Sequence, residues 1–275
     1  MKPLCINFHL LKACNSSCRF CFATFRDVPG RLDAHQAHDL ISQLRKAGGE
    51  KLTFAGGEPT LHPNLCSLID HAKAEGFTTC IVTNGAKLGA VLDASAASID
   101  WIGFSVDSSS ENTQARLGRG SGDHVARTVA LADRCRGLGL HIKLNTVVTA
   151  LNWWEDMTAL VRRIGPERWK ALQVLPIQGQ NDGMVEDLVI SKAQFRAFVD
   201  RHRSLRDEGI DVVDEDNAAM KGSYVMIDPI GRFYGNATGR QIYSAPILDV
   251  GVEEALRQVD FDPHKFDARG GKYAW

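Results

Sequence analysis

The chain carries no excess of charge of either sign. Its 275 residues include 32 lysines and arginines against 33 aspartates and glutamates, so the formal net charge is -1. Nucleic-acid-binding domains normally show a basic surface or stripe. A disordered chain would be poor in hydrophobic residues, which make up 44% of this one. The composition therefore predicts a folded globular protein with no nucleic-acid partner, in which any anion site is local.

Long hydrophobic runs and an even set of cysteines are both absent from the sequence. The apolar stretch before Lys12 is much shorter than the roughly 20 residues of a membrane-spanning helix, and it does not resemble a signal peptide. The seven cysteines are an odd number, which argues against a disulfide framework. These absences predict a cytoplasmic protein with no membrane partner, and we expect it to be a monomer.

Three of the cysteines are clustered and four are scattered. Cys14, Cys18 and Cys21 form a C-x3-C-x2-C loop, which in a reducing compartment points to metal binding or catalysis. The scattered cysteines stand among apolar neighbours, and we interpret them as buried small hydrophobic side chains: Cys5, Cys66, Cys80 and Cys135.

Hydrophobic periodicity predicts strands that alternate with helices. Six strands rich in Val, Ile, Leu or Phe are expected at 4–10, 51–55, 78–83, 101–106, 141–148 and 169–177. The clearest helix begins after Asp33, with Gln36 three residues on, a spacing typical of a capping box. Further helices are expected at 63–75, 89–97, 123–137, 153–164, 191–203 and 252–259.

Strands separated by helices of this length form parallel βαβ units with right-handed crossovers. Six units are two fewer than in a complete eight-stranded barrel. We therefore expect an α/β protein with a partial (βα)6 TIM-like barrel over residues 1–206. Residues 207–275 would form a C-terminal extension, with a hairpin at 224–234, that packs on the barrel and covers its active site.

The cysteine loop, within residues 12–22, directly follows the first expected strand, at the end of the barrel where such folds build active sites. Three thiolates do not complete a tetrahedral zinc site, whereas an iron-sulfur cube held by three cysteines leaves one iron open. A zinc site would need His9 or Cys5 as its fourth ligand. Three unligated thiols in an exposed loop would oxidise readily. The pattern favours an open iron-sulfur cluster.

These residues resemble the radical S-adenosylmethionine (SAM) superfamily. The shared features are the cysteine loop, Phe20 between its last two cysteines, and Gly56-Gly57-Glu58-Pro59 after the second strand. The resemblance implies a 4Fe-4S cluster on Cys14, Cys18 and Cys21, with SAM bound to the open iron and its amino group received by the segment at 56–59. Glycines let backbone approach a ligand closely, and the Glu58 carboxylate can accept from an ammonium group.

Further segments resemble the viperins, including their prokaryotic members. Their order and spacing carry the resemblance: Asn7-Phe-His9, Thr83-Asn-Gly85, Ser105-Val-Asp107-Ser108, Gly118-Arg-Gly120, Lys143-Leu-Asn145, Arg168-Trp-Lys170 and Arg269-Gly-Gly-Lys-Tyr273. Viperins convert a ribonucleoside triphosphate (CTP, UTP or GTP) to its 3'-deoxy-3',4'-didehydro analogue, which terminates viral RNA synthesis. The resemblance thus implies a radical SAM lyase of antiviral defence. Ala55 and Phe8 depart from the usual Ser and Tyr of the family.

The resemblance also implies roles for individual residues. Phe20, Ser105 and Arg119 would join the segment at 56–59 in binding SAM. Asn7 and Asn145 would lie near the nucleotide, and four cations would hold its triphosphate: Lys51, Lys143, Arg168 and Lys170. Tyr273 would donate a proton or hydrogen to the substrate radical, with Lys51 also in the catalytic set. Asp107 has either a structural or a functional role. A flavodoxin- or ferredoxin-type protein would supply electrons.

Other functions stay open from the sequence alone. One is a different radical SAM reaction, such as GTP cyclisation or peptide modification, but those enzymes often bind auxiliary clusters through C-terminal cysteines, and no cysteine follows Cys135. A non-catalytic zinc-binding module and a nucleotide-binding regulator are the alternatives outside this chemistry. The preferred nucleobase does not follow from the sequence.

Overall fold

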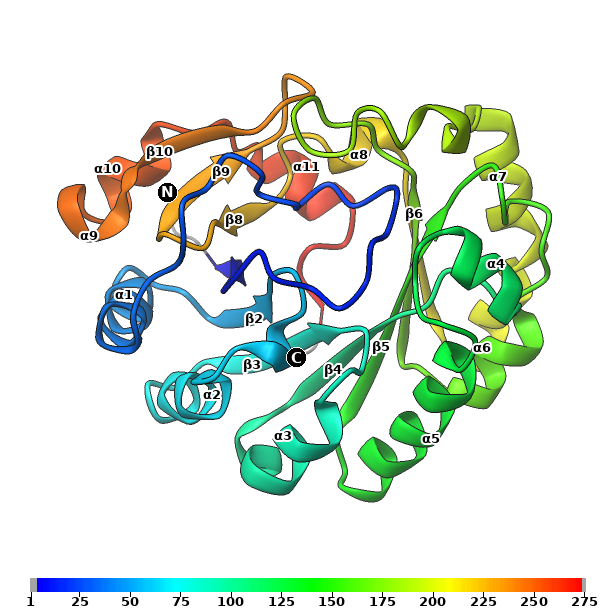
Figure 1. The fold of residues 1–275 in the computed structure, drawn as a ribbon, viewed down its shortest axis with the longest axis horizontal. Coiled ribbons are helices and arrows are strands. Elements are labelled where there is room, and N and C mark those ends of the chain that lie inside the picture. The colour runs from blue at the N-terminus through cyan, green and yellow to red at the C-terminus, as the bar shows by residue number, and fades with distance from the viewer. Residues whose placement is uncertain (1–3, 274–275) are drawn as a thin grey trace.

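The computed structural model describes residues 4–273. Within that range, ten strands form one sheet in the order β10-β9-β8-β1-β2-β3-β4-β5-β6-β7. Every pair from β8 through β1 to β7 is parallel, and β9 and β10 are antiparallel additions. Figure 1 shows the sheet curving into an open barrel with helices around its outside. The expectation of a partial barrel is therefore confirmed.

The six strands expected from periodicity are all present, with some ends shifted by a few residues. They are β1 (Cys5–His9), β2 (Lys51–Ala55), β3 (Thr78–Thr83), β4 (Trp101–Ser105), β5 (His141–Val148) and β6 (Arg168–Gln173). The β-branched and aromatic residues that produced the signal are those that fit a pleated, buried surface.

The sheet continues beyond residue 206. Strand β7 (Asp211–Glu215) pairs in parallel with β6. The expected hairpin forms as β8 (Val225–Ile227) and β9 (Arg232–Gly235), but β8 joins the sheet beside β1. Strand β10 (Ile242–Pro246) completes it. The expected boundary between residues 206 and 207 therefore does not mark the end of the sheet, and the hairpin extends the barrel wall.

The longer helices lie where they were expected. They are α1 (Ala34–Lys46), α2 (Leu65–Ala74), α3 (Leu88–Ser95), α5 (His124–Gly137), α6 (Thr158–Ile164) and α7 (Lys192–Arg201). Helix α6 begins five residues later than expected, because the Asn152 side chain accepts from the Thr149 amide at 2.6 Å and closes a turn. Short helices follow at α4 (Glu111–Arg116), α8 (Asn217–Met220), α9 (Ile247–Val250), α10 (Val252–Arg257) and α11 (Pro263–Ala268).

No helix within residues 4–273 combines the length and the apolar character needed to cross a bilayer.

The strands separate an apolar layer from a polar one. In β1 and β2, Ile6, Phe8 and Phe54 are buried in the main hydrophobic core. Successive side chains of a strand point to opposite faces, so Asn7 and its register partner Thr53 point into the barrel. The packing between sheet and helices therefore provides stability, and the barrel interior is left for polar side chains.

A test of the local folding signals is available at the start of α1. The Asp33 carboxylate accepts from the Gln36 amide at 2.9 Å, and the Gln36 side chain accepts from the Asp33 amide at 3.1 Å. We expect Asp33→Ala to lower the free energy of unfolding by about 1 kcal/mol in urea titrations. Asp39→Ala, on the same helix with only a 3.3 Å contact to Gln43, should cost about 0.5 kcal/mol or less. Equal losses would contradict the capping role.

Candidate functional site

The cysteine loop is held in place by backbone bonds to the segment after α4. The Ser17 amide donates to the Gly118 carbonyl, and the Arg19 amide donates to the Leu117 carbonyl, both at 3.0 Å. On the other side, the Asn181 side chain donates to the Phe20 carbonyl at 3.0 Å. The loop follows β1 and crosses the middle of the barrel in Figure 1. Its position is thus fixed from two sides, independently of the cysteine side chains.

The three thiols of the loop lie close enough to influence one another's ionisation. Burial raises the pKa of each, that of Cys18 to about 12, and the neighbouring thiols add to the effect at Cys18 and Cys21. Thiolates here therefore need a cationic partner. Among residues 4–273, no three His, Cys, Asp or Glu side chains converge so as to hold a single metal ion. In an iron-sulfur cube each thiolate ligates its own iron, and Cys14, Cys18 and Cys21 supply the three thiols that such a group needs.

The zinc alternative gains no fourth ligand. His9 is buried against the rings of Phe25 and Tyr234, at 5.3 and 5.7 Å between ring centroids, and burial lowers its pKa to about 4. Cys5 lies at the opposite end of β1 from the loop.

The glycine segment after β2 packs directly on the cysteine loop. The Gly57 amide donates to the Leu11 carbonyl at 2.6 Å, and the Glu58 amide donates to the Ala13 carbonyl at 2.9 Å. Gly56 has a φ of +153°, and a Cβ on Gly57 would lie 2.2 Å from the Ala13 oxygen. Glycine is therefore required here for the close approach of two backbone segments, which brings residues 56–59 to the cysteines.

Glu58 joins the segment after β2 to the segment after β3. Its buried carboxylate accepts four hydrogen bonds, from the amide and hydroxyl of Thr60, the hydroxyl of Thr83 and the amide of Asn84, at 2.6–3.0 Å. Three of them end on Oε1, and only the Asn84 amide donates to Oε2. A carboxylate oxygen accepts two hydrogen bonds, so Oε2 keeps a place for an ammonium group, and a role of Glu58 in binding the ligand stays a prediction.

Arg119 is placed over the cysteine loop by a buried ion pair. Its Nε donates to the Asp107 carboxylate at 2.5 Å, and its guanidinium lies 5.6 Å from the centroid of the Phe20 ring. Burial alone would lower the pKa of Arg119, but Asp107 outweighs it and raises that pKa. Asp107 also accepts from the Val147 amide at 2.9 Å, so it has a structural role at least, and a functional one stays a prediction. Ser105, at the end of β4, is half-buried and close by in sequence.

The four predicted cations line the barrel interior. Lys51 starts β2, Lys143 lies on β5, and Arg168 and Lys170 lie on β6. The sheet register pairs Lys143 with Arg168 and Asn145 with Lys170. These two pairs therefore lie on one face of the sheet. Asn7 on β1 shares this interior face. The structure thus brings together the residues expected to bind the substrate.

Burial makes these cations costly to keep charged. It lowers the pKa of Lys51 to about 8, with Lys143 and Arg168 acting in the same direction. Burial also lowers the pKa of Lys143, which forms no ion pair or hydrogen bond between residues 4 and 273. An anion entering the barrel would stabilise the charged forms, so binding and protonation favour each other.

Tyr273 reaches into this cation layer from the C-terminal segment. Its hydroxyl accepts a short hydrogen bond from Lys51 Nζ. The ring centroid lies 4.1 Å from Lys51 Nζ and 4.2 Å from the Arg168 guanidinium carbon, with Trp101 packed edge-on. Burial raises the pKa of Tyr273, so its hydroxyl stays protonated. Because Lys51 and Arg168 are the first residues of their strands, this segment lies at the amino ends of the barrel.

Sequence reasoning missed three residues of the interior: Glu215, Tyr224 and Arg269. Glu215 ion-pairs with Lys170 and with Arg269, and Tyr224 donates to it. Their contacts join segments about 9 to 54 residues apart, so spacing gave no signal.

Of the four scattered cysteines, Cys80 and Cys135 are buried as expected, whereas Cys5 and Cys66 are only half-buried. The thiols of Cys5 and Cys80 lie close enough to Lys51 and Tyr273 to influence their pKa values.

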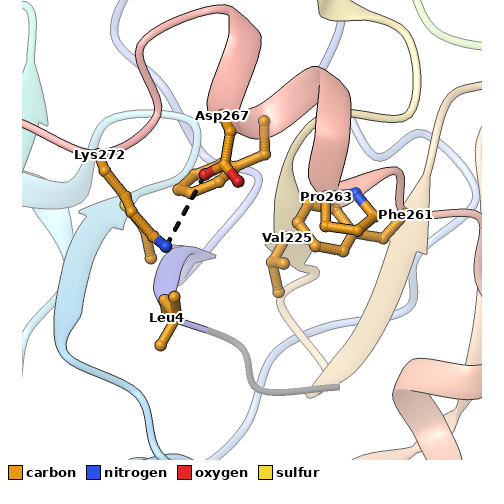
Figure 2. A pocket seen from close by; sticks show the side chains of 8 residues that line it. Leu4, Val225, Phe261, Pro263, Asp267 and Lys272 are labelled. Atoms are coloured by element: carbon orange, nitrogen blue, oxygen red, sulfur yellow. Dashed lines mark ion pairs between the residues drawn. The ribbon is translucent and has the colours of Figure 1, made fainter.

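A separate pocket lies beside the candidate site. It occurs near the start of β1, and Figure 2 shows the Lys272 ammonium and the Asp267 carboxylate, 3.9 Å apart, facing each other beside it. None of the predicted site residues lines it; the lining residues are Leu4, Cys5, Val225, Phe261, Pro263, Phe266, Asp267 and Lys272. The pocket therefore lies between the C-terminal segment and the start of β1.

The close approach at Gly57 can be tested. In Gly57→Ala the new Cβ would meet the Ala13 and Lys12 carbonyls at 2.2 and 2.5 Å, so the cysteine loop must move. We expect a loss of about 2 kcal/mol in stability and less iron and sulfide after anaerobic reconstitution. Gly137→Ala, at the end of α5 with nothing within 4 Å of the new Cβ, is the matched control and should keep both. Normal iron content in Gly57→Ala would contradict this interpretation of the loop.

Comparisons with known proteins agree with this site. Residues 9–164 match the model of the radical SAM superfamily. A protein of Lacinutrix mariniflava called S-adenosylmethionine-dependent nucleotide dehydratase is 42% identical over 98% of this chain, which spans 58% of the relative's length. A protein of the same description from Flammeovirga pacifica is 40% identical, with 98% of this chain and 95% of the relative covered.

A solved structure, Streptococcus suis SuiB bound to S-adenosylmethionine, shares the fold. Its TM-score is 0.71 over 98% of this chain and 68% of that one, at 14% identity. The superfamily uses a 4Fe-4S cluster and SAM, in agreement with the donor set of the cysteine loop. The chain belongs to the radical SAM superfamily and, within it, to the S-adenosylmethionine-dependent nucleotide dehydratases, the viperin family.

Proposed function

We propose that the protein dehydrates a ribonucleoside triphosphate, CTP, UTP or GTP, to its 3'-deoxy-3',4'-didehydro analogue. One observation carries this proposal: four cations share the interior of a barrel whose other end bears the cysteine loop. A triphosphate has about four negative charges at neutral pH, and Lys and Arg are the side chains that bind phosphate groups. The relatives described as nucleotide dehydratases support the same assignment.

The interior residues would bind and orient the nucleotide. The charge of Glu215 supports the charged form of Lys143 against its burial, and phosphate oxygens would add to that support. Arg168 donates to the Gly270 carbonyl at 2.6 Å, and this bond keeps the C-terminal segment beside the cations. Asn7 and Asn145 offer amide groups on the same face for the ribose or base. Fixed cations of this kind hold a substrate in one orientation and exclude water.

The cysteine loop would hold the cofactors. Cys14, Cys18 and Cys21 would ligate a 4Fe-4S cluster, which when reduced and loaded with SAM supplies a one-electron cleavage that produces a hydrogen-abstracting radical. The Arg119 guanidinium, kept charged by Asp107, suits the SAM carboxylate. Ser105 and the backbone of residues 56–59 would complete the site beside Phe20.

Tyr273 and Lys51 would act on the ribose. Removal of the 4'-hydrogen followed by loss of the 3'-hydroxyl as water needs one proton and one further electron to give the neutral product. The Tyr273 hydroxyl stays protonated and accepts a hydrogen bond from Lys51. Tyr273 can therefore donate a proton and take a new one from Lys51, whose pKa is about 8. A flavodoxin- or ferredoxin-type protein would supply the electron. That the protein is a cytoplasmic monomer and acts in antiviral defence stays a prediction.

Turnover tests the proposed function directly. Reconstituted protein, dithionite and SAM should yield 5'-deoxyadenosine and a product one water lighter with at least one of CTP, UTP and GTP. Cys14→Ala should abolish both, because it removes a cluster ligand, whereas Cys66→Ala, on α2 away from the loop, should keep them. If no triphosphate raises 5'-deoxyadenosine above its background, the proposal fails.

Tyr273→Phe tests the hydroxyl separately from the ring. The phenylalanine ring can still lie between Lys51 and Arg168, so KM should change little. Loss of the donor should reduce kcat roughly 100-fold, the lower end of the range for general acid catalysis. Tyr243→Phe, whose hydroxyl contacts Gln241 and Asp27 outside the barrel, serves as the control. An unchanged kcat in Tyr273→Phe would remove this residue from the mechanism.

A further inference from the structure

A buried carboxylate stands among the interior cations. Glu215, the last residue of β7, is fully buried, and it ion-pairs with Lys170 of β6 and, at 3.3 Å, with Arg269 of the C-terminal segment. Tyr224, just before β8, donates to the same carboxylate. A negative charge at this point repels a triphosphate. It can favour binding only if it also keeps the neighbouring cations charged or in position.

The position of this carboxylate in the fold is specific. Strands β7 and β8 are not neighbours in the sheet, so the barrel is open between them. The hydrogen bond that Glu215 accepts from Tyr224 spans that opening. Arg269, which it also holds, packs on the Tyr224 ring at 3.6 Å and donates to the Ser223 carbonyl at 2.8 Å. Glu215 therefore joins the barrel wall to the segment that carries Tyr273.

The electrostatics show what the carboxylate does for Lys170. Burial lowers the pKa of Lys170 well below its usual range, and Arg269 and Lys143 act in the same direction. Glu215 opposes all three. Burial would raise the pKa of Glu215 itself, but Lys170 and Arg269 outweigh it and lower it to about 2. The carboxylate is therefore ionised at neutral pH, and it supports the charged form of Lys170.

We propose that Glu215 is a positioning residue for the substrate, whose carboxylate holds the Lys170 ammonium and the Arg269 guanidinium where the triphosphate meets them. This inference rests on the proposed function, because it takes the interior cations as the triphosphate site. Glu215 does not touch the substrate. Its effect reaches the triphosphate through two cations, and it reaches Tyr273 through the backbone that follows Arg269.

The sign of the pH dependence follows from the groups that face Lys170, which are Glu215, Arg269, Lys143 and Tyr224. Without the Glu215 charge, Lys170 loses its proton at a lower pH. Anion affinity, which falls with rising pH as the lysines deprotonate, should then fall at a lower pH than in the wild type. A purely mechanical support would change the affinity without moving this profile.

The test uses reconstituted holoprotein and inorganic tripolyphosphate, whose affinity is measured by calorimetry between pH 6 and pH 9. We expect Glu215→Gln to weaken binding at least about tenfold at pH 8, as expected for a cation that loses its buried partner, and to move the midpoint of the pH profile down by about one unit. Glu215→Asp keeps the charge, and its affinity for tripolyphosphate should lie between those of the wild type and of Glu215→Gln. Asp214→Asn, an exposed neighbour paired with Arg206, should match the wild type.

The outcomes separate this inference from the proposed reaction. Equal or tighter binding in Glu215→Gln, with an unmoved pH profile, would show that Glu215 only competes with anions and would overturn the proposal. Wild-type protein that fails to bind tripolyphosphate would also overturn it. If Glu215→Gln does not fold, Glu215→Asp decides by its affinity alone, and binding equal to or tighter than that of the wild type would overturn the proposal. Tripolyphosphate binding that depends on Glu215, without turnover of any triphosphate, would support this inference and refute the proposed reaction.

Discussion

Keeping several positive charges inside one barrel is the constraint on which the rest of the structure depends. Removing a charged group from water costs several kcal/mol per ion, and the interior holds Lys51, Lys143, Arg168 and Lys170. The fold offsets this cost by different means. Glu215 neutralises part of the charge, and the ring of Tyr273 lies against two of the cations. The C-terminal segment thus contacts the barrel both through these charges and through apolar side chains such as the buried Phe266.

The loops at the opposite end of the barrel are held in place by other interactions. There the loops are fixed chiefly by backbone contacts and by one buried carboxylate, that of Glu58. Glycine at 57 lets two segments meet at their main chains, Glu58 joins the loops after β2 and β3, and residues 117–118 hold the cysteine loop from the side. Such contacts position three thiols without using the thiols themselves. A site built this way is in place before its cofactor arrives.

Local sequence signals predicted much of the fold, but they did not predict contacts between residues on different elements. The first six strands and the capping box at Asp33 are encoded in short stretches of sequence. Strand β7 was missed because Asp211, Asp214 and Glu215 interrupt its apolar pattern, although the interior of this barrel is polar. The cysteines and interior cations were predicted through resemblance and strand alternation. Glu215, Tyr224 and Arg269 were not, because each matters only through partners on other elements.

The Tyr273 ring lies about 4 Å from two cations that repel each other. An aromatic face attracts both, so the ring acts as an electrostatic spacer, and charge adds to the apolar contact of Phe266 in attaching the segment to the barrel. Attachment of this kind responds to ionic conditions in a way that an apolar contact does not. Any anion that neutralises Lys51 and Arg168 removes part of the reason for the ring to stay, which links the closure of the barrel to what is inside it.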